Sequence, residues 1–429
     1  MNHTLSPGSR TGQVTAPASK SVAHRLFLLA ALGEAPVSVK CPGLCDDIAA
    51  TLACLQALGA DIRQTAAEEY RVTPLSAPPE GLRILPCGES GATLRFLLPL
   101  AGALGASAVF RRAGRLPQRP LAPLAEELCR HGMKIREQGS DLYCSGRLYP
   151  GAYTLPGDVS SQFVSGLLLT LPLLPDDSTL TLTTAAESVP YIALTEQALT
   201  AAGLSFSRIG NRYELPGSQT PRLPAALRVE GDWSAAAVFL CAGALSRGGV
   251  TVHGLSYPTA QGDSEILGIL RQMGAQVRTD GDSVTVQRGE LRGICVDARP
   301  IPDLIPPLCV LAAVAEGETH IQNARRLRLK ESDRLSGLTA LLTDLGGRVT
   351  ETADGLTIRG VPCLAGGCVS SLGDHRLAMA AALGALAAAK PVTVTGGECT
   401  QKSYSAFWED FRSLKGETPC PAPSEKPSV

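Results

Sequence analysis

Apolar residues recur at helical spacing along most of the chain, and five such stretches run into a glycine followed by a short alternating strand. The first copy is LQALGADIR, and the others are LCRHGMKIR, LTAAGLSFS, LRQMGAQVR and LTDLGGRVT. We expect each glycine to end a helix in the left-handed conformation, which explains the residue type without any function. The glycines are Gly59, Gly132, Gly203, Gly274 and Gly346, separated by 73, 71, 71 and 72 residues.

This repeat predicts two series of helices with short strands between them, bounded by Gly, Pro and Asp. One series is expected to begin near Asp46, Arg119, Pro190, Asp263, Ser332 and Tyr404. The other is expected to begin near Ser19, Ser90, Ser160, Trp233, Asp303 and His375. Six α/β units are too many for one core in 429 residues, so we predict an α/β fold divided three and three.

The composition argues against several classes of partner. Basic and acidic residues number 39 and 40, so the formal charge of −1 provides no positive field for nucleic acid or an anionic membrane. The first residues lack a secretory signal and the apolar stretches are shorter than a membrane span, so we expect a soluble, cytoplasmic protein. Thirteen scattered cysteines favour buried thiols, with Cys363 and Cys368 left open as a weak metal pair.

Several common catalytic motifs are missing. The sequence has no G-K dipeptide, no G-x-G, no G-x-S-x-G and no S-x-x-K, and its six histidines show no metal spacing. These observations argue against a P-loop kinase, a simple dehydrogenase and the common serine hydrolases. We therefore predict no metal site.

Unusual polar residues gather where the predicted helices begin, and a helix N-terminus is a favourable place for an anion. Only eight of the basic residues are lysine, and Lys20 and Lys330 are among those at such starts. Lys330 and Arg334 should stand four apart on one helix face, where two cations repel unless an anion lies between them. A serine cap and a solvated charged face are the alternative interpretations of these two segments.

The cations at helix starts, together with two carboxylates, suit a ligand with several negative charges and a proton-transfer step. The polar residues differ from copy to copy, whereas a binding solenoid would tend to repeat its surface chemistry. This difference favours one composite site over a non-enzymatic repeat module. The set is Lys20, Arg25, Arg119, Lys330, Arg334, Arg376 and Lys402, with Asp303 and Glu331.

In this order and spacing, the motifs resemble those of the EPSP synthases, the 3-phosphoshikimate 1-carboxyvinyltransferase family, along nearly the whole chain. The segments are PASKSVAHR, GESGATLRF, LPQRPL, GDVSSQF, ESVPYI, VEGDWSAA, QGD, IPD, RLKESDR, GDHRLAM and QKSY. The resemblance implies a two-domain enolpyruvyl transferase fold with six βαβαββ repeats, three per domain, and the active site in the interdomain cleft. The implied domains are residues 19–229 and residues 1–18 with 230–415, and the Pro-, Ser- and Glu-rich tail 416–429 is predicted to be disordered.

The family transfers the enolpyruvyl group of phosphoenolpyruvate to the 5-hydroxyl of 3-phosphoshikimate and releases phosphate, in the pathway to chorismate and the aromatic amino acids. The resemblance implies these two substrates and no metal or organic cofactor, and we expect a monomer. The nearest alternative is UDP-N-acetylglucosamine enolpyruvyl transferase, whose mobile loop carries a cysteine. The corresponding loop here, residues 111–119, has none, and Ser21 follows Lys20 where that enzyme has Asn.

By motif match, the resemblance implies that Asp303 accepts the hydroxyl proton, that Glu331 exchanges a proton at the methylene carbon and that Lys20 assists catalysis. Residues implied to bind 3-phosphoshikimate are Lys20, Ser21, Arg25, Ser160, Ser161, Gln162, Ser188, Tyr191, Asp303 and Lys330. Residues implied to bind phosphoenolpyruvate are Lys20, Gly91, Arg119, Gln162, Arg334, Arg376 and Lys402. The chain departs from the family pattern at Glu89, where many members carry Asn, at Arg326, where some carry Asn, and at Ala18, which replaces a Gly, so substrate affinities and glyphosate sensitivity stay open.

Overall fold

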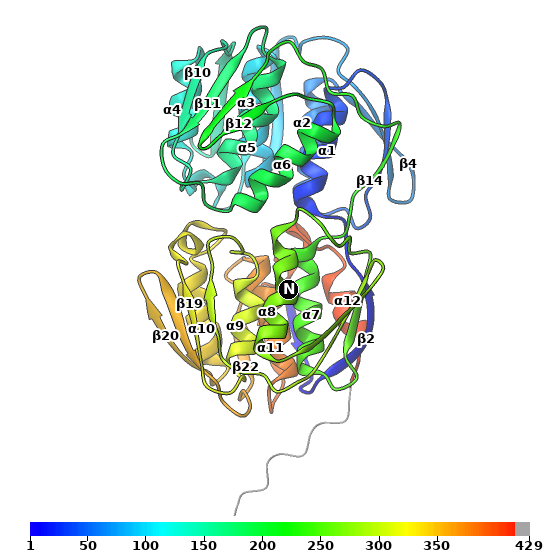
Figure 1. Cartoon of the computed structure of the whole chain (residues 1–429), viewed down its shortest axis with the longest axis vertical. Helices are drawn as coiled ribbons and strands as arrows, with labels where there is room; N and C mark the ends of the chain where they lie inside the picture. The colour runs from blue at the N-terminus through cyan, green and yellow to red at the C-terminus, as the bar shows by residue number, and fades with distance from the viewer. Residues whose placement is uncertain (417–429) are drawn as a thin grey trace, which may run out of the picture.

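The computed structural model describes residues 1–416 and has two lobes stacked end to end (Figure 1). Each lobe has its own hydrophobic core. One core runs from Ala18 to Val229, and we call this part of the chain the first lobe. The other core combines Leu5, Val14 and Ala16 with residues from Trp233 to Leu414, and we call this part the second lobe.

Both predicted helix series are present, and each helix begins within three residues of its expected start. The series after the first strand of each unit is α1 (Lys20–Ala31), α3 (Gly91–Ala103), α5 (Ser161–Thr170), α7 (Trp233–Leu245), α9 (Ile305–Ala312) and α11 (His375–Leu386). The other series is α2 (Asp46–Leu58), α4 (Ala122–Arg130), α6 (Val189–Ala201), α8 (Ile266–Met273), α10 (Arg334–Asp344) and α12 (Phe407–Ser413). The prediction of left-handed glycines is confirmed, because all five repeat glycines have φ between 70° and 118°.

Within residues 1–416 the strands form six sheets, and each sheet contains one parallel pair joined to an antiparallel neighbour. The first-lobe sheets are β14 (Ala226–Arg228)-β3 (Val37–Lys40)-β5 (Glu69–Thr73)-β4 (Asp61–Ala66), β6 (Leu82–Gly88)-β7 (Ser107–Arg112)-β9 (Asp141–Gly146)-β8 (Met133–Gln138) and β10 (Ala152–Leu155)-β11 (Ser178–Leu182)-β13 (Arg212–Leu215)-β12 (Ser207–Ile209). The second-lobe sheets are β16 (Gln276–Asp280)-β17 (Ser283–Gln287)-β15 (Val250–His253)-β2 (Arg10–Thr15)-β24 (Lys415–Gly416), β18 (Cys295–Asp297)-β19 (Glu318–Gln322)-β21 (Gly355–Arg359)-β20 (Arg348–Thr352) and β1 (Asn2–Leu5)-β23 (Val392–Thr395)-β22 (Gly367–Ser370). Of the predicted tail, Gly416 pairs with Arg10, and residues 417–429 lie outside the described residues.

The chain crosses between the lobes twice, and these crossovers set the position of α1 and α7. The first unit takes its first strand, β14, from the end of the first lobe, while the fourth unit takes β2 from the N-terminus. The two crossovers run antiparallel, with an isolated bridge between Ala18 and Gly231. The amide of Ser19 donates to the carbonyl of Glu230 at 2.7 Å. Lys20, the first residue of α1, is therefore held directly at the junction of the lobes.

Two local predictions at the helix starts need correction. Arg119 lies in extended backbone before α4, because Pro120 follows it and disfavours a helical conformation at the preceding residue. Lys330 and Arg334 do not share a helix face. Lys330 follows the 3₁₀ turn η4 (Arg325–Leu329) in extended conformation, and α10 begins only at Arg334, where Asp333 caps the helix by accepting from the amide of Ser336.

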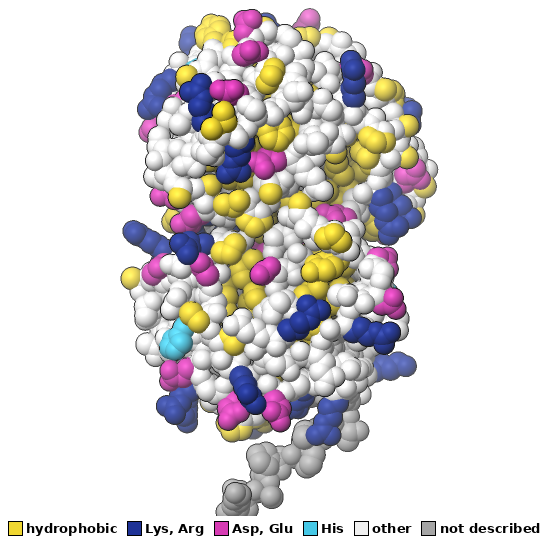
Figure 2. All heavy atoms as spheres, in the orientation of Figure 1, with side chains coloured by type: hydrophobic (Ala, Val, Ile, Leu, Met, Phe, Trp, Pro, Cys, Tyr) yellow, Lys and Arg dark blue, Asp and Glu magenta, His cyan; other side chains and the backbone are white. Residues whose placement is uncertain are grey.

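The surface agrees with a nearly neutral chain. In Figure 2, basic and acidic side chains are interspersed over the visible face and form no extended patch of one sign. Across residues 1–416, no helix combines the length and the apolar character needed to cross a membrane.

Candidate functional site

A pocket lies between the lobes, where helix starts from the first lobe face the segment around Lys330 in the second lobe. The predicted site residues that line it are Lys20, Ser21, Arg25, Arg119, Ser160, Ser161, Gln162, Ser188, Tyr191, Asp303, Lys330, Glu331 and Arg334. Gly91, Arg376 and Lys402 do not line the pocket. Gly91 lies against Arg119, Arg376 contacts Asp303, and Lys402 contacts the buried carboxylate of Asp47. Segments separated by more than 300 residues thus meet in one place.

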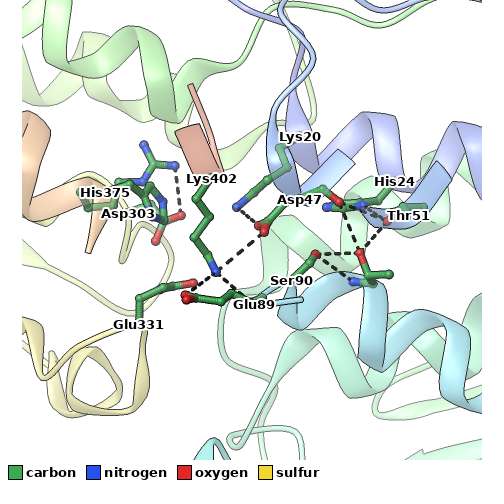
Figure 3. A network of polar contacts seen from close by, with 12 residues as sticks. Lys20, His24, Asp47, Thr51, Glu89, Ser90, Asp303, Glu331, His375 and Lys402 are labelled. Atoms are coloured by element: carbon green, nitrogen blue, oxygen red, sulfur yellow. Dashed lines mark hydrogen bonds and ion pairs between the residues drawn. The ribbon is translucent and has the colours of Figure 1, made fainter. Parts of the chain in front are cut away.

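Two predicted lysines converge on a carboxylate that the sequence interpretation did not include, Asp47 (Figure 3). The Lys20 ammonium lies 2.9 Å from one carboxylate oxygen of Asp47, and the Lys402 ammonium lies 3.8 Å from the other. Burial disfavours all of these charges, but the two lysines lower the pKa of Asp47, and Asp47 and Glu331 raise the pKa of Lys20. Lys20 is therefore a firmly protonated cation beside the pocket.

Lys402 also contacts Glu89 of the first lobe. The Lys402 ammonium donates to the backbone carbonyl of Glu89 at 2.7 Å and lies 3.5 Å from its carboxylate. The Glu89 side chain packs against Gly114, where a Cβ would lie 2.1 Å from a carboxylate oxygen. Glu89 therefore places a half-exposed negative charge next to Lys402, a cation of the site.

The two predicted catalytic carboxylates each lie among cations. Glu331 accepts from Arg119 of the first lobe at 3.3 Å and from Arg334 at 2.9 Å. Asp303 accepts from Arg334 at 2.8 Å, and its carboxylate lies 3.6 Å from the Lys330 ammonium. Burial raises both pKa values, but the surrounding cations outweigh it and hold the pKa of Asp303 and of Glu331 well below the ordinary range. Both side chains are consequently ionised at neutral pH.

Arg334 is the centre of a buried ion network. Its side chain is 1% exposed and donates to Asp374 at 2.8 Å as well as to Asp303 and Glu331. Asp374 caps α11 by accepting from the backbone amide of Arg376 at 2.9 Å, while the Arg376 side chain donates to Asp303 at 3.3 Å. The same carboxylate oxygen of Asp303 lies near both Lys330 and Arg334, so it provides the anion that these two cations require.

The first-lobe wall of the pocket is held by Arg25. Its guanidinium donates to the carbonyls of Ser21 and Tyr191 at 2.6 and 2.8 Å and to the hydroxyl of Thr195 at 2.8 Å. It also lies 5.1 Å above the ring of Phe96. Burial lowers the pKa of Arg25 to about 9, so the guanidinium stays charged at neutral pH and ties α1 to α6.

A second arginine, Arg95, holds the start of α5 against α3. Arg95 donates to the side-chain oxygen of Gln162 at 2.6 Å. Ser160 caps α5 by accepting from the backbone amide of Gln162. Gly91 has no room for a side chain, because a Cβ would lie 2.9 Å from a nitrogen of Arg95 and 3.0 Å from one of Arg119. Gly91 therefore lets two guanidinium groups approach the backbone at the start of α3.

Ser188 and Arg326 connect the lobes at the rim of the pocket. Arg326 donates to the Ser188 hydroxyl at 3.0 Å and to the Glu187 carboxylate at 3.2 Å. Ser188 has a left-handed backbone (φ 52°) and donates to the carbonyl of Arg299 at 3.3 Å. Arg326 is thus both a pocket-lining cation and a contact between the lobes.

Sequence reasoning missed Asp47, His24 and the role of Arg95. His24 borders the pocket one helical turn after Lys20, and its Nδ1 lies 2.7 Å from the Thr51 hydroxyl (Figure 3). Burial lowers the pKa of His24 to about 3, so its imidazole is neutral. Asp47 carried only a weak signal, because an acidic residue in the first turn of a helix is usual. His375, which also lines the pocket, is buried, and its pKa is well below the usual value because of burial and the nearby Lys20.

Residues 6–411 match the family described as "EPSP synthase (3-phosphoshikimate 1-carboxyvinyltransferase)". The chain is 38% identical over 416 residues to the 3-phosphoshikimate 1-carboxyvinyltransferase of Clostridium kluyveri, covering 96% of this chain and 97% of the relative. It is also 38% identical to the enzyme of that name from Clostridium beijerinckii, with 97% and 98% covered.

Among solved structures, an EPSP synthase from Acinetobacter baumannii superimposes with a TM-score of 0.78 at 27% identity, covering 96% of this chain and 98% of that one. The enolpyruvyl transferase NikO from Streptomyces tendae shares the fold at a TM-score of 0.76 and 20% identity, covering 97% of each chain. These similarities confirm the predicted enolpyruvyl transferase fold. The chain belongs to the EPSP synthase family.

Proposed function

We propose that this protein transfers the enolpyruvyl group of phosphoenolpyruvate to the 5-hydroxyl of 3-phosphoshikimate, giving 5-enolpyruvylshikimate 3-phosphate and phosphate. The observation that carries the proposal is the pocket between the lobes, where several cations surround two ionised carboxylates. Both substrates carry a phosphate and a carboxylate, so they need such cations, and the addition needs a base and an acid. Membership of the EPSP synthase family supports this reaction, which belongs to chorismate and aromatic amino acid biosynthesis.

For phosphoenolpyruvate, we propose that the binding residues are those around Glu331 and Asp47. Arg119 and Arg334 already hold a carboxylate, that of Glu331, and a guanidinium pairs with carboxylate or phosphate through parallel hydrogen bonds. Phosphoenolpyruvate therefore matches the chemistry of this part of the pocket. The proposed set is Lys20, Gly91, Arg119, Gln162, Arg334, Arg376 and Lys402.

For 3-phosphoshikimate, we propose the wall formed by α1, α5 and α6 with Lys330 opposite. Hydroxyls and free amides at the start of α5 suit the oxygens of a phosphate, and Lys330 provides a cation across the pocket. Burial lowers the pKa of Lys330 to about 8, so an anionic ligand would favour its charged form. The proposed set is Lys20, Ser21, Arg25, Ser160, Ser161, Gln162, Ser188, Tyr191, Asp303 and Lys330.

For the chemistry, we propose that Asp303 accepts the proton of the 5-hydroxyl, that Glu331 exchanges a proton at the methylene carbon, and that Lys20 stabilises developing charge. Asp303 is a weak base while Lys330, Arg376 and Arg334 surround it. We expect the two anionic substrates to engage these cations and so to raise the pKa of Asp303. The same cations would then stabilise the charge of the tetrahedral intermediate.

We also propose that the chain forms two domains, residues 19–229 and residues 1–18 with 230–415. We propose further that the protein is a cytoplasmic monomer that needs no nucleic acid or membrane. The separate cores on either side of the crossovers support this division. Native-state hydrogen exchange should reveal two sets of amides that open with different free energies in low denaturant. A single opening free energy in both lobes would contradict the division, and sedimentation as a dimer would contradict the monomer.

A competition between two acceptors tests the proposed reaction. The protein is incubated with phosphoenolpyruvate and equal amounts of 3-phosphoshikimate and UDP-N-acetylglucosamine, and both acceptors are then analysed by mass spectrometry. We expect the enolpyruvyl group only on 3-phosphoshikimate. Its appearance on the nucleotide sugar would instead support the alternative enzyme of the same fold.

A further inference from the structure

Three consecutive residues of the second lobe, Gln261, Gly262 and Asp263, contact the crossovers or the first lobe, and none of them lines the pocket. Gly262 and Asp263 open the 3₁₀ turn η3 (Gly262–Glu265), which precedes α8. The segment is one of the motifs on which the family resemblance depends, yet the proposed reaction gives it no role.

Gln261 joins the two crossovers. Its side chain is buried, and its oxygen accepts from the Ser19 hydroxyl at 3.0 Å and from the amide of Trp233 at 3.2 Å. Its side-chain nitrogen donates to the carbonyl of Gly231 at 2.8 Å. One amide group therefore fixes the residue before Lys20 against the residues that lead into α7. A side chain that offers only acceptors or only donors could not make all three bonds.

Gly262 lies directly against the first turn of α6. A Cβ at this position would lie 2.3 Å from the Cβ and 2.5 Å from the Cγ of Pro190, so an added side chain requires the segment of Gly262 or that of Pro190 to shift. Pro190 precedes Tyr191, which lines the pocket. The lack of a side chain at Gly262 thus sets how closely the second lobe approaches α6.

Asp263 bridges the lobes at the next residue. One carboxylate oxygen accepts from the Tyr191 hydroxyl at 3.2 Å and from the Ser234 hydroxyl, while the other oxygen is buried without a partner. The carbonyl of Ser234 in turn accepts from Arg376 at 2.7 Å. The charged groups that act on Asp263 are Asp303, Arg376 and Asp232.

We infer that the segment Gln261-Gly262-Asp263 is a positioning segment that sets the second lobe against the crossovers and α6, and thereby places Lys20 and Tyr191 over the pocket. It acts through these residues and does not touch the substrates. The kinetic part of the inference rests on the proposed function, whereas the effect on the arrangement of the lobes does not.

The first test enlarges the residue at position 262 and measures the steady-state kinetics of the full chain. Gly262→Ala should reduce kcat/KM for 3-phosphoshikimate by about a hundredfold, because small displacements of positioning groups have effects of that size. Gly268→Ala is the matched control, since a Cβ there meets nothing within 4 Å. Adding Pro190→Gly to Gly262→Ala removes both atoms of the clash and should restore most of the activity. Equal kinetics for Gly262→Ala and Gly268→Ala would overturn the inference.

Scattering separates this inference from the proposed function. If the wild-type protein transfers no enolpyruvyl group, the function is wrong, and the segment is then judged by small-angle scattering alone. We expect a larger radius of gyration for Gly262→Ala than for wild type and Gly268→Ala, at an unchanged circular dichroism spectrum. An unchanged radius would count against the positioning role.

Asp263 provides a second readout, in the pH dependence of stability. Burial and then the neighbouring Asp303 raise the pKa of Asp263 from 3.8 to about 7. Asp263 therefore keeps a proton in the folded chain that it releases in the unfolded chain, and its contribution to the free energy of unfolding falls as the pH rises from about 4 to about 7 and then levels off. Asp263→Asn keeps an oxygen for Tyr191 but cannot ionise. In urea unfolding, the stability of the wild type relative to Asp263→Asn should fall over this range, and a constant difference would contradict the placement of Asp263.

Discussion

The variant Glu331→Gln should lose turnover by about a hundredfold to ten-thousandfold while binding both substrates nearly as well as the wild type, because general acid–base groups contribute on this scale. Glutamine keeps the shape of the side chain and one acceptor oxygen, whereas Arg119 and Arg334 donate to different oxygens of Glu331 at 3.3 and 2.9 Å, so one of the two guanidinium groups loses its partner. Glutamine cannot exchange a proton with the methylene carbon. The variant also frees the two guanidinium groups from a competing negative charge, so KM for phosphoenolpyruvate should stay the same or fall.

The measurement for Glu331 is the separate determination of kcat and of both KM values. Glu351→Gln is a suitable control, because Glu351 pairs with Arg328 at 2.7 Å in the same region but does not line the pocket. We expect this control to behave like the wild type. Unchanged kcat in Glu331→Gln would remove Glu331 from the chemistry, and a large rise in KM alone would make it a binding residue only.

The variant Asp47→Asn should be destabilised by about 3 to 5 kcal/mol, the usual consequence of removing one partner of a buried ion pair. Asp47 is 5% exposed and is the carboxylate on which Lys20 and Lys402 converge at 2.9 and 3.8 Å. Without it, the two ammonium groups repel each other and the pKa of Lys20 falls. We expect the activity to fall as well, since Lys20 loses the carboxylate that fixes its position and favours its charged form.

Denaturant unfolding of Asp47→Asn, beside Asp46→Asn, tests this account of the site. Asp46 precedes Asp47 at the start of the same helix, but its side chain is exposed. Both variants remove one negative charge from the first turn of α2, so a difference between them reports the buried contacts and not the helix dipole. Equal stability of the two variants would show that the Lys20–Asp47–Lys402 cluster contributes little to the fold.

The repeat and its helices were predictable because their signals are local. A glycine with positive φ after an apolar helix, as at Gly59 and Gly274, leaves the same trace in every copy. By contrast, the pairing that supplies the first strand of the first unit is not local. β14 is three residues long and pairs with β3 almost 190 residues earlier, so no periodicity predicts it, and only the family resemblance implied the crossovers.

In the site, too, the features with a local sequence signal were predictable and those that depend on distant segments were not. Helix starts marked most of the pocket, because the residues that bind anions must also lie near free backbone amides. The contacts of Asp47 and Asp263 were not predictable, since each is an ordinary acidic residue near a helix start until its partners on other segments are known. The prediction that Lys330 and Arg334 share a helix face was wrong for a local reason. Asp333 is a strong cap, so α10 begins after Lys330 and later than the charge spacing indicated.

The rate of phosphate release from phosphoenolpyruvate, measured with and without each acceptor, tests the central claim most directly. We predict release when 3-phosphoshikimate is added, none with phosphoenolpyruvate alone or with UDP-N-acetylglucosamine, and only a small fraction of that release in Glu331→Gln. Release that depends on UDP-N-acetylglucosamine, or that proceeds without an acceptor, would contradict the proposed function.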